Sequence, residues 1–240
     1  MLHKLLCISS FLLIVFSTTA QHKETNANML WTNYNNYIQL NEKNIVLNDI
    51  QIRGRDWTNK WSVIAVRTGL SHKINSKFTV AGGLAWFGSF RYSNENRLLL
   101  NEWRAWQDIT LLQKQKSILF THRLRLEERF LQAVKNGFKT TDYTLRLRLR
   151  YRLEMGFPIY KKVLTGGIGN EVMGNINHIN DNLFFDQNRT FLLLSMKISP
   201  AISFQFQYIK LYQWFAAQNT MDNQDVFRFS VHHQILKIKK

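Results

Sequence analysis

Arginine and glutamate recur at every second position in two neighbouring segments of the chain. Residues 123–129 read Arg-x-Arg-x-Glu-x-Arg, and in residues 143–154 four arginines alternate with leucines and tyrosines. Side chains two residues apart on an extended strand share a face, so each segment has one charged and one apolar face. His122 and Glu128 fall on the apolar face. The charged set is Arg123, Arg125, Glu127, Arg129, Arg146, Arg148, Arg150, Arg152 and Glu154.

A turn signal lies between the two charged segments. Asn136-Gly137 is the dipeptide most typical of a two-residue β-hairpin. Such a turn pairs Lys135 with Phe138, and continuing the pairing sets Glu127 opposite Arg146. The charged faces of both strands then lie on the same side. Because directly opposed like charges are unfavourable, we expect acids from neighbouring strands or bound anions beside them.

Glu171 and Arg189 flank a predicted loop centred near residue 180, so we expect them to face each other on adjacent strands. A structural ion pair in the interior of the protein is the preferred interpretation, and a catalytic or ligand-binding role is the alternative. Glu102 and Asp108 share one face of another predicted strand and are candidate partners for the arginines.

The remaining motifs do not predict a catalytic, metal or cofactor site. His232 and His233 are adjacent in a predicted strand and point to opposite faces, so they cannot chelate one metal. Residues 166–169 read Gly-Gly-Ile-Gly, but they lack the spacing and the following helix of a nucleotide-binding loop. There is no Gly-x-Ser-x-Gly elbow. We therefore assign no catalytic residue, metal or cofactor.

These side chains sit on a series of predicted strands. Apolar and polar residues alternate with period two in segment after segment, and most segments have about the 9 to 11 residues that a tilted membrane strand needs. No stretch after the first twenty residues is long and apolar enough for a membrane-spanning helix. The predicted strands cover residues 30–40, 45–55, 61–70, 78–88, 98–109, 117–130, 143–154, 162–173, 186–198, 201–213 and 225–236.

The connections predict how the strands are arranged. Short links such as residues 72–77, 156–161 and 199–200 alternate with longer polar ones at 89–97, 175–185 and 216–224. Outer-membrane barrels have short periplasmic turns and longer external loops. We therefore predict an all-β, antiparallel up-and-down transmembrane β-barrel of 10–12 strands. Eleven ranges make the first and last strands run in the same direction, so an even count requires one strand to be missed or miscounted.

The first twenty residues read as a cleavable signal peptide. Lys4 precedes an apolar run over residues 5–16, and small residues end at Ala20. The expected domains are a signal peptide at 1–20 and an outer-membrane barrel at 21–240. The only cysteine, Cys7, lies in the leader, so the exported chain has no thiol.

The chain is strongly basic, with 32 Lys and Arg against 16 Asp and Glu, and without its leader it carries +15. Export and arginines placed in strands argue against nucleic acid as the partner. The expected partners are the lipid bilayer, anionic lipid head groups or small anions, and the barrel assembly machinery.

Several of these motifs together resemble a known family. They are Trp31, the charged segments at 123–129 and 146–150, Asn170-Glu171 and residues 186–189, which read Asp-Gln-Asn-Arg. The chain is similar over nearly its whole exported length to a family of uncharacterised outer-membrane barrel-like proteins, domain of unknown function 2490. The resemblance implies the barrel fold but no activity, ligand or catalytic residue.

Three functions remain open at this point. The leading hypothesis is a non-enzymatic, porin-like outer-membrane barrel whose lumen carries the Arg/Glu network, with a structural role or a narrow passage for anions. The alternatives are an outer-membrane lipid-modifying enzyme and a soluble, lipocalin-like periplasmic carrier. A histidine within hydrogen-bond reach of Ser, Asp or Glu near the outer rim would favour the enzyme, and an apolar lumen would favour the carrier.

Overall fold

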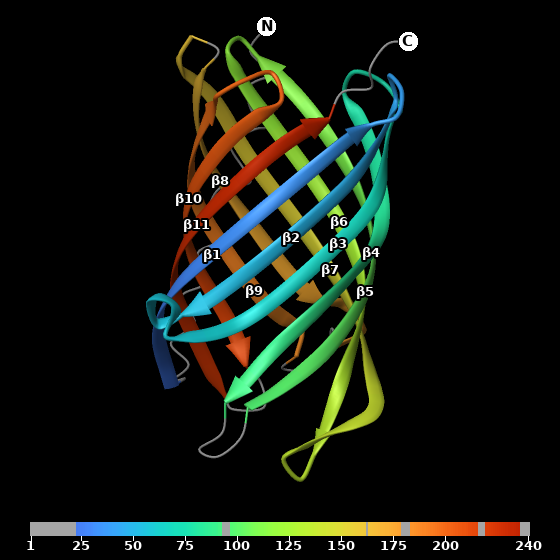
Figure 1. The fold of residues 1–240 in the computed structure, drawn as a ribbon, viewed down its shortest axis with the longest axis vertical. Coiled ribbons are helices and arrows are strands. Elements are labelled where there is room, and N and C mark those ends of the chain that lie inside the picture. The colour runs from blue at the N-terminus through green and yellow to red at the C-terminus, as the bar shows by residue number, and fades with distance from the viewer. Residues whose placement is uncertain (1–22, 93–96, 162, 179–182, 216–218, 236–240) are drawn as a thin grey trace, which may run out of the picture.

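Eleven β-strands form a closed barrel in the computed structural model (Figure 1). The structure describes residues 23–92, 97–161, 163–178, 183–215 and 219–235, so the predicted signal peptide lies outside the described residues. The strands are β1 (Lys23–Gln39), β2 (Asn44–Arg55), β3 (Lys60–Lys73), β4 (Phe78–Tyr92), β5 (Arg97–Gln115), β6 (Ile118–Lys135), β7 (Phe138–Tyr160), β8 (Leu164–Asn175), β9 (Phe185–Lys197), β10 (Ile202–Phe215) and β11 (Thr220–Ile235). Two short 3-10 turns are η2 (Asp56–Thr58) and η3 (Ile176–His178).

The barrel closes through a parallel pair of strands. Each strand is antiparallel to the next in sequence, but β1 pairs with β11 in parallel, from Lys23 opposite Thr220 to Ile38 opposite Ile235. We call this pairing the seam. The expectation of an even strand count is therefore wrong. An odd number of alternating strands makes the first and last run in the same direction, and here a parallel ladder joins them without an additional strand.

The connections at the two ends of the barrel are similar in length, except for the longer link at 176–184. The turn end carries links 40–43, 74–77, 116–117, 161–163 and 198–201, and the loop end carries 56–59, 93–96, 136–137, 176–184 and 216–219. Two of the three predicted long loops are shorter than expected, because β4 continues to Tyr92 and β11 begins at Thr220. The hairpin of β6 and β7 projects beyond the rest of the loop end (Figure 1).

The β6–β7 register differs from the predicted one by two residues. Lys135 pairs with Phe138 as predicted, but an irregularity between Gln132 and Val134 shifts the rest, so Glu127 lies opposite Arg148 instead of Arg146. Gln132 donates from Nε2 to the Thr140 carbonyl at 2.8 Å, which holds this irregularity. A shift of two residues leaves every side chain on its predicted face, since strand side chains alternate with period two.

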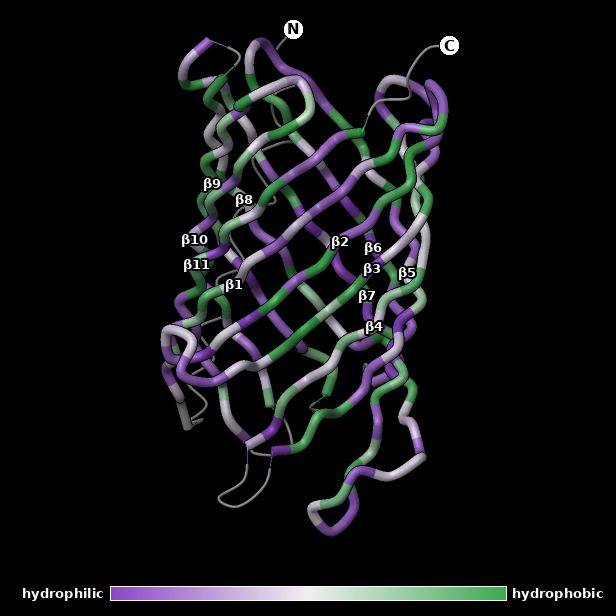
Figure 2. Tube along the Cα trace, in the orientation of Figure 1, coloured by the Kyte–Doolittle hydropathy of each residue, from purple (hydrophilic) through white to green (hydrophobic). Residues whose placement is uncertain are grey.

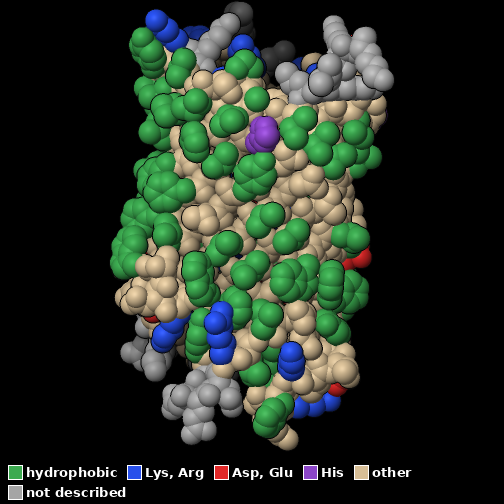
Figure 3. Space-filling model, in the orientation of Figure 1, with side chains coloured by type: hydrophobic (Ala, Val, Ile, Leu, Met, Phe, Trp, Pro, Cys, Tyr) green, Lys and Arg blue, Asp and Glu red, His purple; other side chains and the backbone are tan. Residues whose placement is uncertain are grey.

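The outward face of the wall is apolar and the inward face is mixed. Figure 2 shows polar and apolar residues alternating along the strands, and Figure 3 shows apolar side chains over the middle of one face, with Lys and Arg mostly near the ends. His122, on this outward face, shares a 2.9 Å hydrogen bond with the Tyr151 hydroxyl. Glu128 accepts a 3.5 Å bond from Gln107. Neighbouring side chains thus satisfy both polar groups.

Two apolar clusters lie inside the barrel. One lies between β1 and β9–β11 and comprises Ala27, Met29, Trp31, Phe191, Leu193, Ile209, Leu211 and Val226; the other comprises Ala65, Ala85, Phe87 and Trp106. No helix in the described ranges is long and apolar enough to cross a membrane.

Candidate functional site

Glu127 of β6 is the centre of the charged interior. Its carboxylate accepts hydrogen bonds from Arg148 at 2.9 Å through Nε, with Nη2 also bound, and from Arg150 Nη1 at 2.5 Å. Arg104 of β5 contributes a third, longer contact of 3.4 Å. The residue is only 2% exposed. Strand register explains the grouping, because Arg148 lies directly opposite Glu127 and Arg150 is the next inward residue on the same strand.

Glu171 of β8 is a second shared carboxylate. Arg123 and Arg150 donate to its Oε1 at 2.7 and 2.8 Å, and Arg189 Nη1 lies 3.6 Å from its Oε2. Glu171 and Arg189 are register partners on β8 and β9, as the sequence predicted. However, the other two arginines lie closer, so the carboxylate serves three guanidinium groups rather than one pair.

Three further acids lie close to arginines in the same network. Asp108 accepts from Arg125 at 2.9 and 2.5 Å, and Glu102 accepts from Arg129 at 2.5 Å. Asp186 of β9 accepts from Arg148 at 2.7 Å. Strand alternation alone does not predict the inward position of Asp186, because both it and Gln187 are buried beside a register shift between β8 and β9.

The other predicted residues lie nearby. Arg152 donates to Glu154 two residues along β7, and Arg146 is half-buried opposite Arg129. The sequence prediction missed Arg104, which pairs with Glu102, and an ion pair on the far wall, in which Arg67 of β3 donates through Nε to Asp49 of β2 at 2.9 Å. Asp49 and Arg67 are direct register partners. The alternation in residues 45–55 and 61–70 could therefore have predicted that both side chains face inward.

Aromatic rings support several of these guanidinium groups. Arg125 lies 4.5 Å above the Trp106 ring, Arg104 lies 3.5 Å above Phe87, and Arg53 lies 4.1 Å above Trp31. The Trp106 indole packs directly against Gly69, where a Cβ would lie only 2.5 Å from the ring. Cation–π contacts of this kind are stronger where water is excluded.

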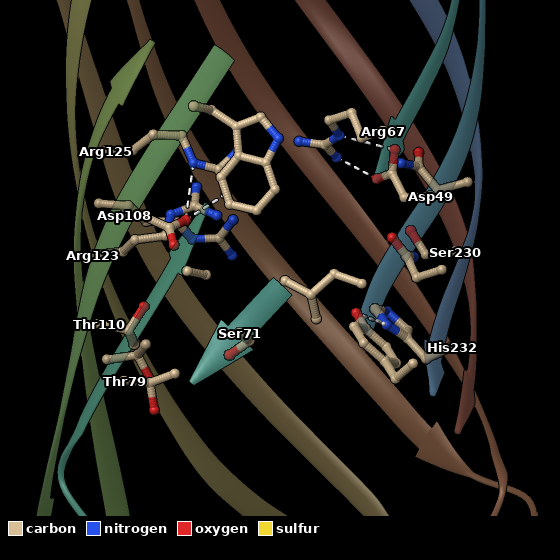
Figure 4. A pocket seen from close by; sticks show the side chains of 18 of the residues that line it. Asp49, Arg67, Ser71, Thr79, Asp108, Thr110, Arg123, Arg125, Ser230 and His232 are labelled. Carbon is tan, nitrogen blue, oxygen red and sulfur yellow. Dashed lines mark hydrogen bonds and ion pairs between the residues drawn. The ribbon is translucent and has the colours of Figure 1, made fainter. Parts of the chain in front are cut away.

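A cavity of about 440 Å³ lies inside the barrel toward the turn end (Figure 4). Figure 4 shows the pair of Arg125 with Asp108 on one side and the pair of Arg67 with Asp49 on the other. Arg123, Arg152, Glu154, Arg228 and His232 also line it, together with hydroxyl groups of Ser71, Thr79, Thr110 and Ser230. A second cavity of about 450 Å³ shares Tyr37, Gln205 and His232 with the first.

Toward the loop end, side chains fill the sector of the interior between β1 and β9–β11. Met29, Leu211 and Val226 are buried there, and Trp31 and Gln207 are almost fully buried near the barrel centre. Packing in this sector is therefore apolar, whereas ion pairs line the cavity.

The described residues do not assemble a recognisable catalytic or metal centre. No group of three or more His, Cys, Asp or Glu in this part of the chain could hold a metal ion. His232 and His233 bond to the hydroxyls of Tyr37 and Tyr34 at 3.1 and 2.8 Å, and His72 bonds to Asn44. His122 bonds to a tyrosine as well.

The fold and the interior define a class of protein: an all-β, eleven-stranded closed barrel packed with arginine–carboxylate ion pairs. A family model described as "Protein of unknown function (DUF2490)" matches residues 28–222, and the chain belongs to that family. No curated protein and no solved structure matches the chain.

Proposed function

We propose that this chain is an outer-membrane β-barrel whose interior is closed by a network of ion pairs, with a structural rather than an enzymatic role. The observation that carries the proposal is the distribution of polarity across the wall. On β7, Leu145, Leu149 and Tyr151 are exposed on the outside, whereas Arg148 and Arg150 are buried inside. A water-soluble barrel needs the reverse distribution, with polar side chains outside, where the wall meets water, and an apolar core.

The positions of aromatic side chains support a membrane. Trp57, Trp61 and Tyr92 are exposed at or next to the loop end. Tryptophan and tyrosine are enriched where a bilayer meets water, because one part of the ring system is apolar and another is polar. The longer link at 176–184 then marks the external end and the turn end is periplasmic, as in other bacterial barrels.

Charge and packing also argue against the two alternatives. A lipocalin-like carrier needs an apolar interior, but this one holds buried arginines on shared carboxylates. An enzyme of the outer rim needs a histidine beside Ser, Asp or Glu at the loop end, but His122, His232 and His233 lie near the turn end and bond to tyrosines. No specific observation favours the carrier or the enzyme.

Fractionation of cells that express the full chain tests the location. We expect the protein in the outer-membrane fraction, with a gel mobility that changes on boiling because closed barrels resist detergent until heated. Recovery in the soluble periplasm would refute the membrane proposal. A known outer-membrane barrel and a periplasmic protein in the same cells control for the separation.

Planar-bilayer recording of the refolded protein tests whether the barrel interior is closed to ions. We expect no steady conductance, since Glu127, Trp31 and Gln207 leave almost no exposed surface at the centre. Any residual current should favour anions, because the inward-facing arginines outnumber the acids and low-dielectric walls focus their field. A large cation-selective current in the wild-type protein would contradict both expectations.

A further inference from the structure

Arg228 of β11 stands out among the arginines of the turn-end cavity. Among the described residues no acid lies within ion-pair distance of it, and its Nε is buried without a hydrogen-bond partner. Two other arginines, Arg123 and Arg152, line the same cavity. A guanidinium group held beside another cation needs a compensating anion.

Arg123 and Arg152 add to the same excess of positive charge. They are direct register partners on β6 and β7, where like charges oppose each other. Arg123 shares Glu171 with Arg150 and Arg189, and its Nε is buried without a partner. Arg152 pairs with Glu154, so this side of the cavity has two carboxylates, Glu154 and the shared Glu171, for a larger number of arginines.

The opposite parts of the cavity wall are balanced. Arg67 and Arg125 each bond through two nitrogens to their own carboxylate, Asp49 and Asp108. The excess of positive charge therefore lies on the side of Arg123, Arg152 and Arg228, which we call the arginine triad. All three line the cavity of about 440 Å³.

We propose that the arginine triad binds a small, soluble oxyanion of the phosphate class, either free phosphate or a phosphate monoester. Guanidinium groups bind phosphate oxygens in a two-pronged geometry, and several arginines around one cavity match the several oxygens of one such group. The cavity has the volume of a small-molecule site, and its hydroxyl groups can donate to a ligand.

The phosphate comes from a soluble molecule rather than from a bilayer lipid. Every neighbouring pair of strands in the barrel is joined by a continuous ladder, including the seam. A lipid outside the wall has no lateral route to the triad through the described strands. This inference goes beyond the proposed function, because an interior oxyanion site does not depend on where the barrel resides.

Isothermal titration of the refolded full-length barrel with inorganic phosphate tests the proposal. We expect saturable binding of one phosphate per barrel, competition by sulfate, and weaker binding at high chloride. Arg228→Gln should weaken binding about tenfold or more, since a hydrogen bond to a charged group contributes about 1.5 to 3 kcal/mol. Arg228 makes no ion pair, so this variant should retain the fold.

Two further variants make the result decisive. Arg91→Gln removes the same charge from an exposed site at the end of β4 and should bind phosphate like the wild type. Ser71→Trp keeps every arginine but fills the cavity, and it should abolish binding while the barrel still shifts on a gel when boiled. Absence of phosphate binding by the wild type overturns the proposal, as does equal loss in the Arg91 and Arg228 variants or full binding by the Ser71 variant. Phosphate binding by a protein recovered from the periplasm would refute the membrane location alone.

Discussion

At the scale of single residues, shared carboxylates hold the interior together. Burying an ion is costly, and the cost is offset only where the geometry is good and the remaining hydrogen-bonding groups are satisfied. Glu127 contacts Arg148, Arg150 and Arg104, and Glu171 contacts Arg123, Arg150 and Arg189, although the Nε atoms of the last three are buried without a partner. Removing one carboxylate therefore exposes several arginines to one another.

Glu127 and Glu128 form a matched pair for testing this role. Glu127→Gln should destabilise the barrel by about 3 to 5 kcal/mol, because it leaves buried arginines without their counter-charge. Glu128→Gln makes the same chemical change one residue away on the outward face, where the carboxylate accepts a 3.5 Å hydrogen bond from Gln107, and it should cost little. Urea unfolding in lipid vesicles measures both, and equal losses would contradict the assigned faces.

The Glu171–Arg189 pair allows a sharper test. Glu171→Gln should lower the unfolding temperature, and adding Arg189→Gln should restore only a small part of the loss. The reason is distance: Arg123 and Arg150 lie 2.7 and 2.8 Å from Glu171, against 3.6 Å for Arg189. Full recovery in the double variant would show that Arg189 is the dominant partner after all. Thermal melts of the two variants and of Arg189→Gln alone complete the cycle.

At the scale of elements, strand parity decides which side chains face outward from the barrel. The irregularity in the β6–β7 hairpin displaces the pairing by two residues and leaves the leucines outside. A displacement by one would have turned the arginines of β7 outward. The hairpin can thus project beyond the wall without disturbing the charged interior.

Two positions on β7 test the outward face. Leu149 is 37% exposed within the wall, and Phe138 is 71% exposed at the tip of the projecting hairpin. Leu149→Arg should reduce assembly, with a cost of about 2 to 4 kcal/mol if the residue lies near the bilayer midplane. Phe138→Arg introduces the same side chain beyond the wall and should assemble normally. The fraction of each variant that shows heat-modifiable mobility measures the effect, and equal assembly would place Leu149 outside the bilayer.

At the scale of the whole molecule, the seam completes the wall and leaves no unpaired strand edge. Exposed edges can pair with other chains, and closure removes them. Side chains reinforce the seam, since Thr25 donates to Asp222 at 2.7 Å and Tyr37 stacks on His232. The chain therefore enters at one end of the barrel and its last strand finishes at the other.

Cysteine cross-linking tests the parallel register of the seam. Leu30 and Phe227 are register partners on β1 and β11, so Leu30→Cys with Phe227→Cys should form a disulfide on oxidation. The native chain offers no competing thiol beyond Cys7 in the predicted leader. Leu30→Cys with Phe229→Cys shifts one partner by two residues and should cross-link poorly. A higher yield for the second pair would disprove the register.

The sequence by itself determined which residues form strands and which face of each strand is charged. Alternation depends only on backbone geometry, so it predicted eleven strands and the inward face of Arg148 and Arg150, although several strands, such as β7, extend beyond the predicted bounds. The Asn136-Gly137 turn is likewise local, and it fixed the pairing of its nearest residues.

Only the tertiary structure decided how the barrel closes and how the charges are shared. The parallel seam joins residues about two hundred positions apart, and no local pattern encodes it. The grouping of Arg123, Arg150 and Arg189 around Glu171 depends on four strands and on the displacement at Gln132. Registers of separate strand pairs combine in such a network, so an error of two residues in one pair changes every contact while leaving every face correct.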